Sequence, residues 1–304
     1  MDEGPGRRFG PTAVVVSLAP TKDGVAALAL DATSDFCEDV AVLSCVNLAG
    51  PIKVFTSADG STFTPHAGPT GTLQLEMDGL AGDHPFFERG VAPLLLVRSE
   101  DRWLGASDDG IAWDAVTVDG KGRQFVEGGA AAFGGGYVAT GTTNGTVKLA
   151  HSTDGRTWTT APFPTACGLP RQLLAADEGL LVVGDESIDA GPSGVRWCSS
   201  TDGSSFVRVK DYAPLGASDA GDECDGVCPA GFVASDGSRL VAYRPFGGQA
   251  GWMSTDGVHW TELSFSGSAP SGTAAGSEPF TLSVLPFGIV GANADGVTWR
   301  GAAS

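Results

Sequence analysis

The chain has 304 residues, 42% of them hydrophobic and 18% charged, which is enough apolar material for a large core. Its formal net charge of -18 argues against a nucleic-acid partner, because phosphates would be repelled. No run of about 18 apolar residues is present, so no membrane-spanning helix is expected.

Short apolar or alternating stretches bounded by Gly, Asp and Pro predict strands along the whole chain, and none has the periodicity of a substantial helix. The stretches fall into groups of four. In chain order we expect strands near 13–19, 25–31, 52–57 and 62–67; 86–91, 94–99, 102–107 and 111–116; 123–129, 137–141, 147–152 and 157–163; 171–177, 180–186, 194–200 and 205–211; 231–237, 239–245, 250–255 and 259–265.

A short motif recurs between the last two strands of each group. It reads SADGSTF (57–63), SDDGIAW (107–113), STDGRTW (152–158), STDGSSF (200–206) and STDGVHW (254–260), with a weaker copy, NADGVTW, at 293–299. Successive Asp residues of the five strong copies are 50, 45, 48 and 54 positions apart. A period of roughly 40 to 50 residues matches one four-stranded propeller blade.

Each residue type of the motif has a structural role. Asp-Gly predicts a two-residue hairpin turn in which both residues have positive φ. The Ser hydroxyl and the Asp carboxylate are expected to bond backbone amides, and the aromatic ring to bury against the neighbouring blade. The expected structural residues are Asp59, Asp109, Asp154, Asp202 and Asp256, with Trp113, Trp158 and Trp260.

These units resemble the Asp-box (BNR-type) repeats of sialidase-like β-propellers, although every copy here has one residue fewer between Asp and Gly. The resemblance implies a β-propeller over nearly the whole chain, with the boxes at the periphery and away from the ligand face. It carries little information about activity.

We therefore expect an all-β chain forming a single domain, a six-bladed propeller of four-stranded antiparallel blades. The blades are placed near 12–66, 84–118, 123–164, 170–212, 230–265 and 280–304. VTWRGAAS (297–304) aligns better with a third strand than with a fourth, and GRRF (6–9) has the tail of a box. The segment 5–10 is thus expected to supply the last outer strand and close the ring; seven blades is the alternative.

Six cysteines predict disulfides, and the pairs close in sequence are typical of local bridges. The expected pairs are Cys37–Cys45, Cys167–Cys198 and Cys224–Cys228. Free thiols are the alternative, and zinc is disfavoured because Cys224-x-x-x-Cys228 has no second ligand pair. The start, MDEGPGRRFG, shows no signal peptide. We expect a secreted or periplasmic protein whose leader is absent from this chain.

The longer insertions, 31–50, 65–85, 185–194, 211–230 and 264–279, are expected on the face opposite the boxes, which is where a ligand would bind. Arg123-Gln124 and Arg171-Gln172 begin two adjacent first strands there, and two guanidiniums would favour an anion. Pairing with nearby acids such as Glu127 and Asp177 is the alternative reading.

Two other groups on that face are candidates. Asp219, Asp222, Glu223 and Asp225 crowd one loop, where oxygen ligands could hold calcium, although the usual calcium-loop pattern is absent. The acidic loop 31–39 poses the same question. His66 and His84 bracket another loop, and His84 adjoins Asp83, but no nucleophile can be assigned to that pair. No other cofactor is expected.

The favoured function is a non-catalytic, monomeric binding protein that holds a glycan, peptide or protein ligand, with an anionic ligand favoured by the arginines. The alternatives are a sialidase-like or other two-carboxylate glycoside hydrolase, and an assembly or scaffold factor. A sialidase needs a tyrosine nucleophile and an F/Y-R-I-P element. That element is missing, and the three tyrosines, Tyr137, Tyr212 and Tyr243, are expected on second strands or after a fourth strand.

Overall fold

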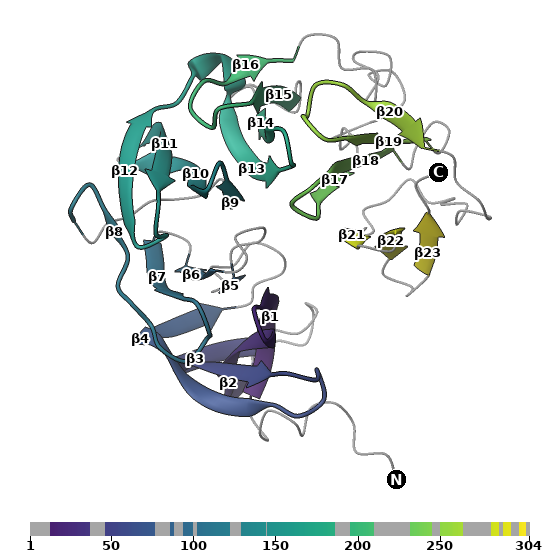
Figure 1. Ribbon diagram of the computed structural model, residues 1–304. Helices are drawn as coiled ribbons and strands as arrows, with labels where there is room; N and C mark the ends of the chain where they lie inside the picture. The colour runs from purple at the N-terminus through teal and green to yellow at the C-terminus, as the bar shows by residue number, and fades with distance from the viewer. Residues whose placement is uncertain are drawn as a thin grey trace. The chain divides into compact units, whose positions relative to one another are not determined.

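The computed structural model describes residues 13–36, 46–76, 86–87, 94–99, 102–121, 129–143, 145–185, 195–209, 232–244, 250–263, 281–285, 288–292 and 298–301. Within these ranges every element is a strand except one 3-10 turn, η2 (Thr165–Cys167), so the predicted all-β class is confirmed. Consecutive strands pair into antiparallel sheets of the kind that form propeller blades (Figure 1). The number of blades and the closing role of 5–10 stay predictions.

The chain divides into two compact units, which are described separately. The first comprises Met1–Glu127 and Gly141–Ala161, and the second Gly128–Thr140 and Pro162–Ser304. No helix in the described part of the chain has the length and apolar character needed to cross a bilayer.

The first sheet of the first unit has the expected strand order, but its strands are longer than predicted. Backbone pairing continues into the insertions expected at 31–50 and 65–85, where Ala32 pairs with Leu48 and Asn47 with Glu76. His66, expected where the fourth strand meets a long loop, lies within a strand opposite Val54. The strands are β1 (Ala13–Thr21), β2 (Gly24–Phe36), β3 (Val46–Ser57) and β4 (Thr64–Glu76).

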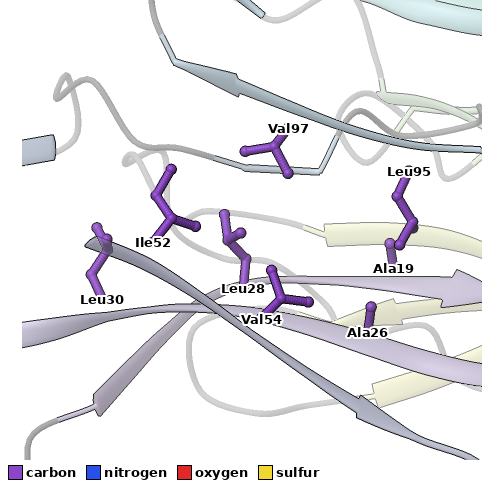
Figure 2. Packing of buried hydrophobic residues seen from close by; sticks show 8 residues of the cluster. All are labelled: Ala19, Ala26, Leu28, Leu30, Ile52, Val54, Leu95 and Val97. Carbon is purple, nitrogen blue, oxygen red and sulfur yellow. The ribbon is translucent and has the colours of Figure 1, made fainter. Parts of the chain in front are cut away.

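A core joins this sheet to the next one along the chain. Residues 26–30 of β2 are all buried, and side chains alternate between the two faces of a strand, so both faces of this sheet are apolar. Leu28, Leu30 and Val54 are fully buried, and Figure 2 shows them facing Leu95 and Val97 of the second sheet. This packing holds the first two sheets together.

The second sheet has three strands, β5 (Phe86–Phe87), β6 (Leu95–Ser99) and β7 (Arg102–Ser107). The prediction of a fourth strand at 111–116 is wrong, because this segment forms only one bridge, between Ala106 and Asp114. After this bridge the chain leaves β7 and pairs elsewhere: Thr117 N–H donates to Arg156 O at 2.8 Å. Residues 117–118 form β8 (Thr117–Val118), which pairs in parallel with β12 (Thr157–Pro162).

The strand predicted at 123–129 lies outside the described residues, apart from Gly129. The first described strand of that group is β9 (Ala130–Phe133), paired with β10 (Gly136–Thr143), in which the chain passes between the two units. Gly134 and Gly135 have φ of 62° and 77°, which only glycine adopts easily, and they make the tight turn that sets this register. The next strand is β11 (Thr146–Ser152).

The remaining sheets belong to the second unit and follow the predicted order closely (Figure 1). The last sheet ends on β23 as its third strand, as predicted, and Arg8 and Phe9 lie outside the described residues. The strands are β13 (Leu169–Ala175), β14 (Leu180–Asp185), β15 (Val195–Ser200) and β16 (Val207–Arg208); β17 (Phe232–Ser235), β18 (Leu240–Arg244), β19 (Ala250–Ser254) and β20 (Thr261–Leu263); β21 (Thr281–Leu285), β22 (Gly288–Ala292) and β23 (Thr298–Gly301).

Candidate functional site

The five Ser-x-Asp-Gly turns share one hydrogen-bond pattern, which is local to the motif. In each, one Asp carboxylate oxygen accepts from the Ser hydroxyl and from the backbone N–H groups two and three residues later, at 2.7 to 3.1 Å. In four turns the Ser hydroxyl also accepts from the Gly N–H at 2.8 to 2.9 Å. The motif is a structural staple, as predicted.

The predicted backbone conformation of these turns is wrong. Only the glycines have positive φ, between 70° and 78°, and the Asp residues do not. An Asp with negative φ can aim its carboxylate at the amides that follow, as in an Asx turn. A turn with positive φ at both positions occurs instead at Asp119 (φ 52°) and Gly120 (φ 70°), which lack the aromatic residue three positions later.

The amide donors keep the turn carboxylates ionised. They lower the pKa of Asp59, Asp109, Asp154 and Asp202. Burial raises the pKa of Asp256, but hydrogen bonds from His259 and the following amides outweigh it and lower the pKa to about 2. A carboxylate that holds no proton near neutral pH cannot serve as a general acid, so these residues are poor candidates for that role.

Four of the five aromatic residues of the motif pack against a neighbouring sheet, as predicted, whereas Phe63 packs against its own sheet. Trp158 is fully buried, its ring centroid lies 4.4 Å from that of Trp103 in β7, and its indole N–H donates to Gly155 O. Phe206 packs against Phe163, which follows β12. Trp113 and Trp260 are half-buried and join apolar clusters shared by two sheets.

One ion-pair cluster at these turns has no sequence signature. Arg156, in the residue position that follows Gly in the motif, donates to Asp114 at 2.7 Å and to Asp108 at 3.0 Å. These bonds raise the pKa of the guanidinium. Because Arg156 is 42 and 48 positions from these two partners in the chain, only the folded structure reveals that it ties its turn to the segment after β7.

The opposite end of the sheet β13–β16 holds the candidate ligand residues. Pro170 pairs with Gly184 and Gln172 with Val183, so Arg171 is the extra residue of a β-bulge. Arg171 and Gln172 are both exposed. A bulge lets neighbouring side chains project from a strand edge, and a guanidinium beside an amide suits a carboxylate or another anion.

The other predicted ligand residues cannot be placed beside this pair. Arg123, Gln124 and His84 lie outside the described residues, as do Asp219, Asp222, Glu223 and Asp225 and the cysteines Cys37, Cys45, Cys224 and Cys228. Among the described residues, no group of three or more His, Cys, Asp or Glu side chains could hold a metal ion. His66 bonds Thr56 through its Nε2 at 2.9 Å, and Tyr137 and Tyr243 lie on second strands, as predicted.

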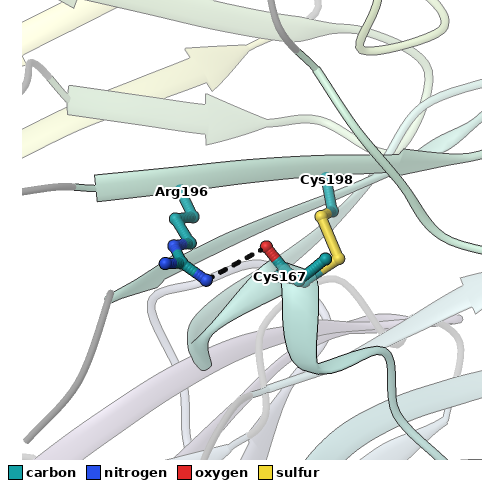
Figure 3. The surroundings of a disulfide bond; sticks show 4 residues. Cys167, Arg196 and Cys198 are labelled. Carbon is teal, nitrogen blue, oxygen red and sulfur yellow. Dashed lines mark hydrogen bonds between the residues drawn. A yellow bond between two sulfur atoms is a disulfide. The ribbon is translucent and has the colours of Figure 1, made fainter.

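The predicted disulfide between Cys167 and Cys198 is present, and both residues are buried. It ties the turn η2, just before β13, to β15 (Figure 3). A buried disulfide is typical of proteins from oxidising compartments.

No family model matches the chain, and no curated protein does. Among solved structures, virginiamycin B lyase from Staphylococcus aureus is similar at 10% identity and a TM-score of 0.44, over 96% of this chain and 85% of that one. A mutant Trypanosoma rangeli sialidase with trans-sialidase activity is similar at 15% identity and a TM-score of 0.41, over 95% and 53%. A structure reported for the GH130 family of mannoside phosphorylases has 12% identity and a TM-score of 0.36, over 83% and 84%. Values this low carry no activity across to this chain.

Acidification provides a test of the turn carboxylates. The folded pKa of Asp256, about 2, lies below its ordinary value of 3.8, so its contribution to the unfolding free energy is complete above pH 3.8 and is lost as the pH falls through 2. We expect Asp256→Asn, which keeps an acceptor oxygen but no charge, to lose less stability than the wild type across that range. Urea unfolding at several pH values measures the unfolding free energy of both proteins. An equal dependence of that free energy on pH in the two proteins would contradict the prediction.

Proposed function

We propose that this protein is a secreted or periplasmic binding protein that holds an anionic ligand, such as an acidic glycan, at the end of its sheets opposite the Ser-x-Asp-Gly turns. The observation that supports this is the β-bulge at that end of the sheet β13–β16. Arg171 is the extra residue of the bulge, and Arg171 and Gln172 are both exposed there.

The choice of an anion follows from the chemistry of the pair. Arg presents a planar fork of N–H donors that matches a carboxylate or sulfate, and Gln adds a further donor and an acceptor. The net charge of -18 would repel an anion at long range, so binding must depend on short, directed hydrogen bonds. A carboxylate on an otherwise neutral sugar meets that requirement better than a polyanion does.

Arg171→Ala tests the proposal, with D-glucuronate and D-glucose as probes that differ in one carboxylate. We expect the wild type to bind D-glucuronate more tightly in calorimetry. Because a hydrogen bond to a charged group is worth about 1.5 to 3 kcal/mol, Arg171→Ala should weaken D-glucuronate binding about tenfold or more. Arg208→Ala is the matched control, since Arg208 is an exposed arginine of the same sheet, on its outer strand β16.

Two results would contradict the proposal. Equal affinity of the wild type for the two sugars would rule out a preference for an anionic ligand. Equal losses of D-glucuronate affinity in the two variants would rule out Arg171 as the binding residue. A glycan array of acidic and neutral sugars extends the test to larger ligands. Turnover of chromogenic glycosides by the wild type would favour the glycoside hydrolase alternative instead.

A further inference from the structure

Three contacts converge on the short turn that leads into β13. The Cys167–Cys198 disulfide links η2 to β15. The Arg196 guanidinium, also on β15, donates to Ala166 O at 3.4 Å, and Figure 3 shows this bond beside the disulfide. Within the turn, Cys167 N–H donates to Pro164 O at 3.0 Å. The segment that precedes Arg171 is therefore held both covalently and by hydrogen bonds.

The strand between these partners leaves no room for the turn to move inward. At Gly184 in β14, an added Cβ would lie 2.5 Å from Cys167 O and 2.8 Å from Leu169 O. Gly184 pairs with Pro170 on one side and with Arg196 on the other. The backbone of residues 167–169 thus rests directly on β14, and the bulge at Arg171 begins immediately after it.

We infer that the Cys167–Cys198 disulfide and Arg196 are positioning residues for the proposed anion site. They hold the first residues of β13 in the register that creates the bulge, and the bulge presents Arg171 and Gln172 to the ligand. This inference rests on the proposed function for its ligand. Its structural half, that the disulfide and Arg196 hold the start of β13 in place, can be measured without a ligand. Binding residues perform best when the elements that carry them are locked by their surroundings.

Amide hydrogen exchange of the Cys167→Ser/Cys198→Ser double variant tests the structural half. We expect exchange in 169–175 to rise about tenfold or more relative to the wild type, while exchange in 240–244 of β18 stays close to its wild-type rate. Strand β18 is the internal control because its sheet contains neither cysteine. An equal rise in both strands, or no rise in 169–175, would overturn the inference.

Arg196→Gln keeps the inference testable if the double Ser variant does not fold. This variant retains the disulfide but shortens the side chain that reaches Ala166 O. We expect its circular dichroism to match the wild type, exchange in 169–175 to rise, and D-glucuronate affinity to fall roughly tenfold. Unchanged exchange in Arg196→Gln would overturn the role of Arg196.

The two proposals fail in different ways. If the wild type does not distinguish D-glucuronate from D-glucose, the proposed function is contradicted while the exchange rates still decide whether the disulfide holds β13. If exchange in 169–175 rises and the variants keep full D-glucuronate affinity, the positioning role is contradicted while the anion site stands.

Discussion

Gly24→Ala is expected to lower the unfolding free energy by about 3 kcal/mol or more, because it combines backbone strain with a clash that no rotamer relieves. Gly24 begins β2 with φ of 148°, a conformation that residues with a Cβ rarely adopt. An added Cβ would lie 2.0 Å from the carbonyl oxygen of Ser57 and 2.8 Å from the Cα of Ala58. Because both atoms belong to the backbone, the whole turn would have to shift.

Gly134→Ala is the matched control for this change. Gly134 also lies in a turn between the first two strands of its group, with φ of 62°, but an added Cβ would meet nothing within 4 Å. The unfolding free energy should therefore fall only by the cost of placing alanine in a left-handed backbone conformation, about 1 to 2 kcal/mol. Chemical denaturation measures both variants, and equal losses would show that the contact with Ser57 is unimportant.

Trp158→Ala is expected to cost about 3 to 5 kcal/mol of unfolding free energy, the range for removing a large, fully buried aromatic side chain. Trp158 is 0% exposed, stacks at an angle on Trp103 and donates its indole N–H to Gly155 O at 2.9 Å. The substitution would leave a cavity between β12 and β7 and an unsatisfied carbonyl in the turn.

Phe63→Ala provides the comparison at the same motif position. Phe63 is half-buried and packs beside Ala27, Ala29 and Phe55 of its own sheet. Phe63→Ala should therefore lower the unfolding free energy clearly less than Trp158→Ala does. A second pair isolates the hydrogen bond: Trp158→Phe should cost about 1 kcal/mol more than Trp113→Phe. The indole N–H of Trp113 is buried and has no hydrogen-bond partner among the described residues. A loss from Phe63→Ala equal to that from Trp158→Ala would contradict the proposed contact between sheets.

The stapling role of the repeated turns could be predicted from the sequence because it depends on local chemistry. Ser, Asp and Gly lie within four residues, so their hydrogen bonds need no distant partner. The error in the Asp backbone conformation has the same local origin. Asp-Gly alone favours two positive φ values, but the Asp residues of these turns do not have positive φ, and their carboxylates accept hydrogen bonds from two following amides.

The candidate site could be predicted less completely. The sequence predicts Arg171 and Gln172 at the start of a first strand, and they lie there. The bulge that exposes them was not visible, because it depends on how Pro170 and Gln172 pair with β14. A register shift is decided by pairing across strands, which a single stretch of sequence does not contain.

By itself, the sequence determined the all-β class, the grouping of strands around five repeated turns and the Cys167–Cys198 pair, since regular spacing and residue type suffice for these. Only the tertiary structure decided that 117–118 leaves its own group to pair with β12, that Arg156 bridges Asp108 and Asp114, and that Arg196 holds the turn before Arg171. Each of these contacts joins residues about 30 to 50 positions apart. Their energy depends on distances that exist only after the sheets have packed.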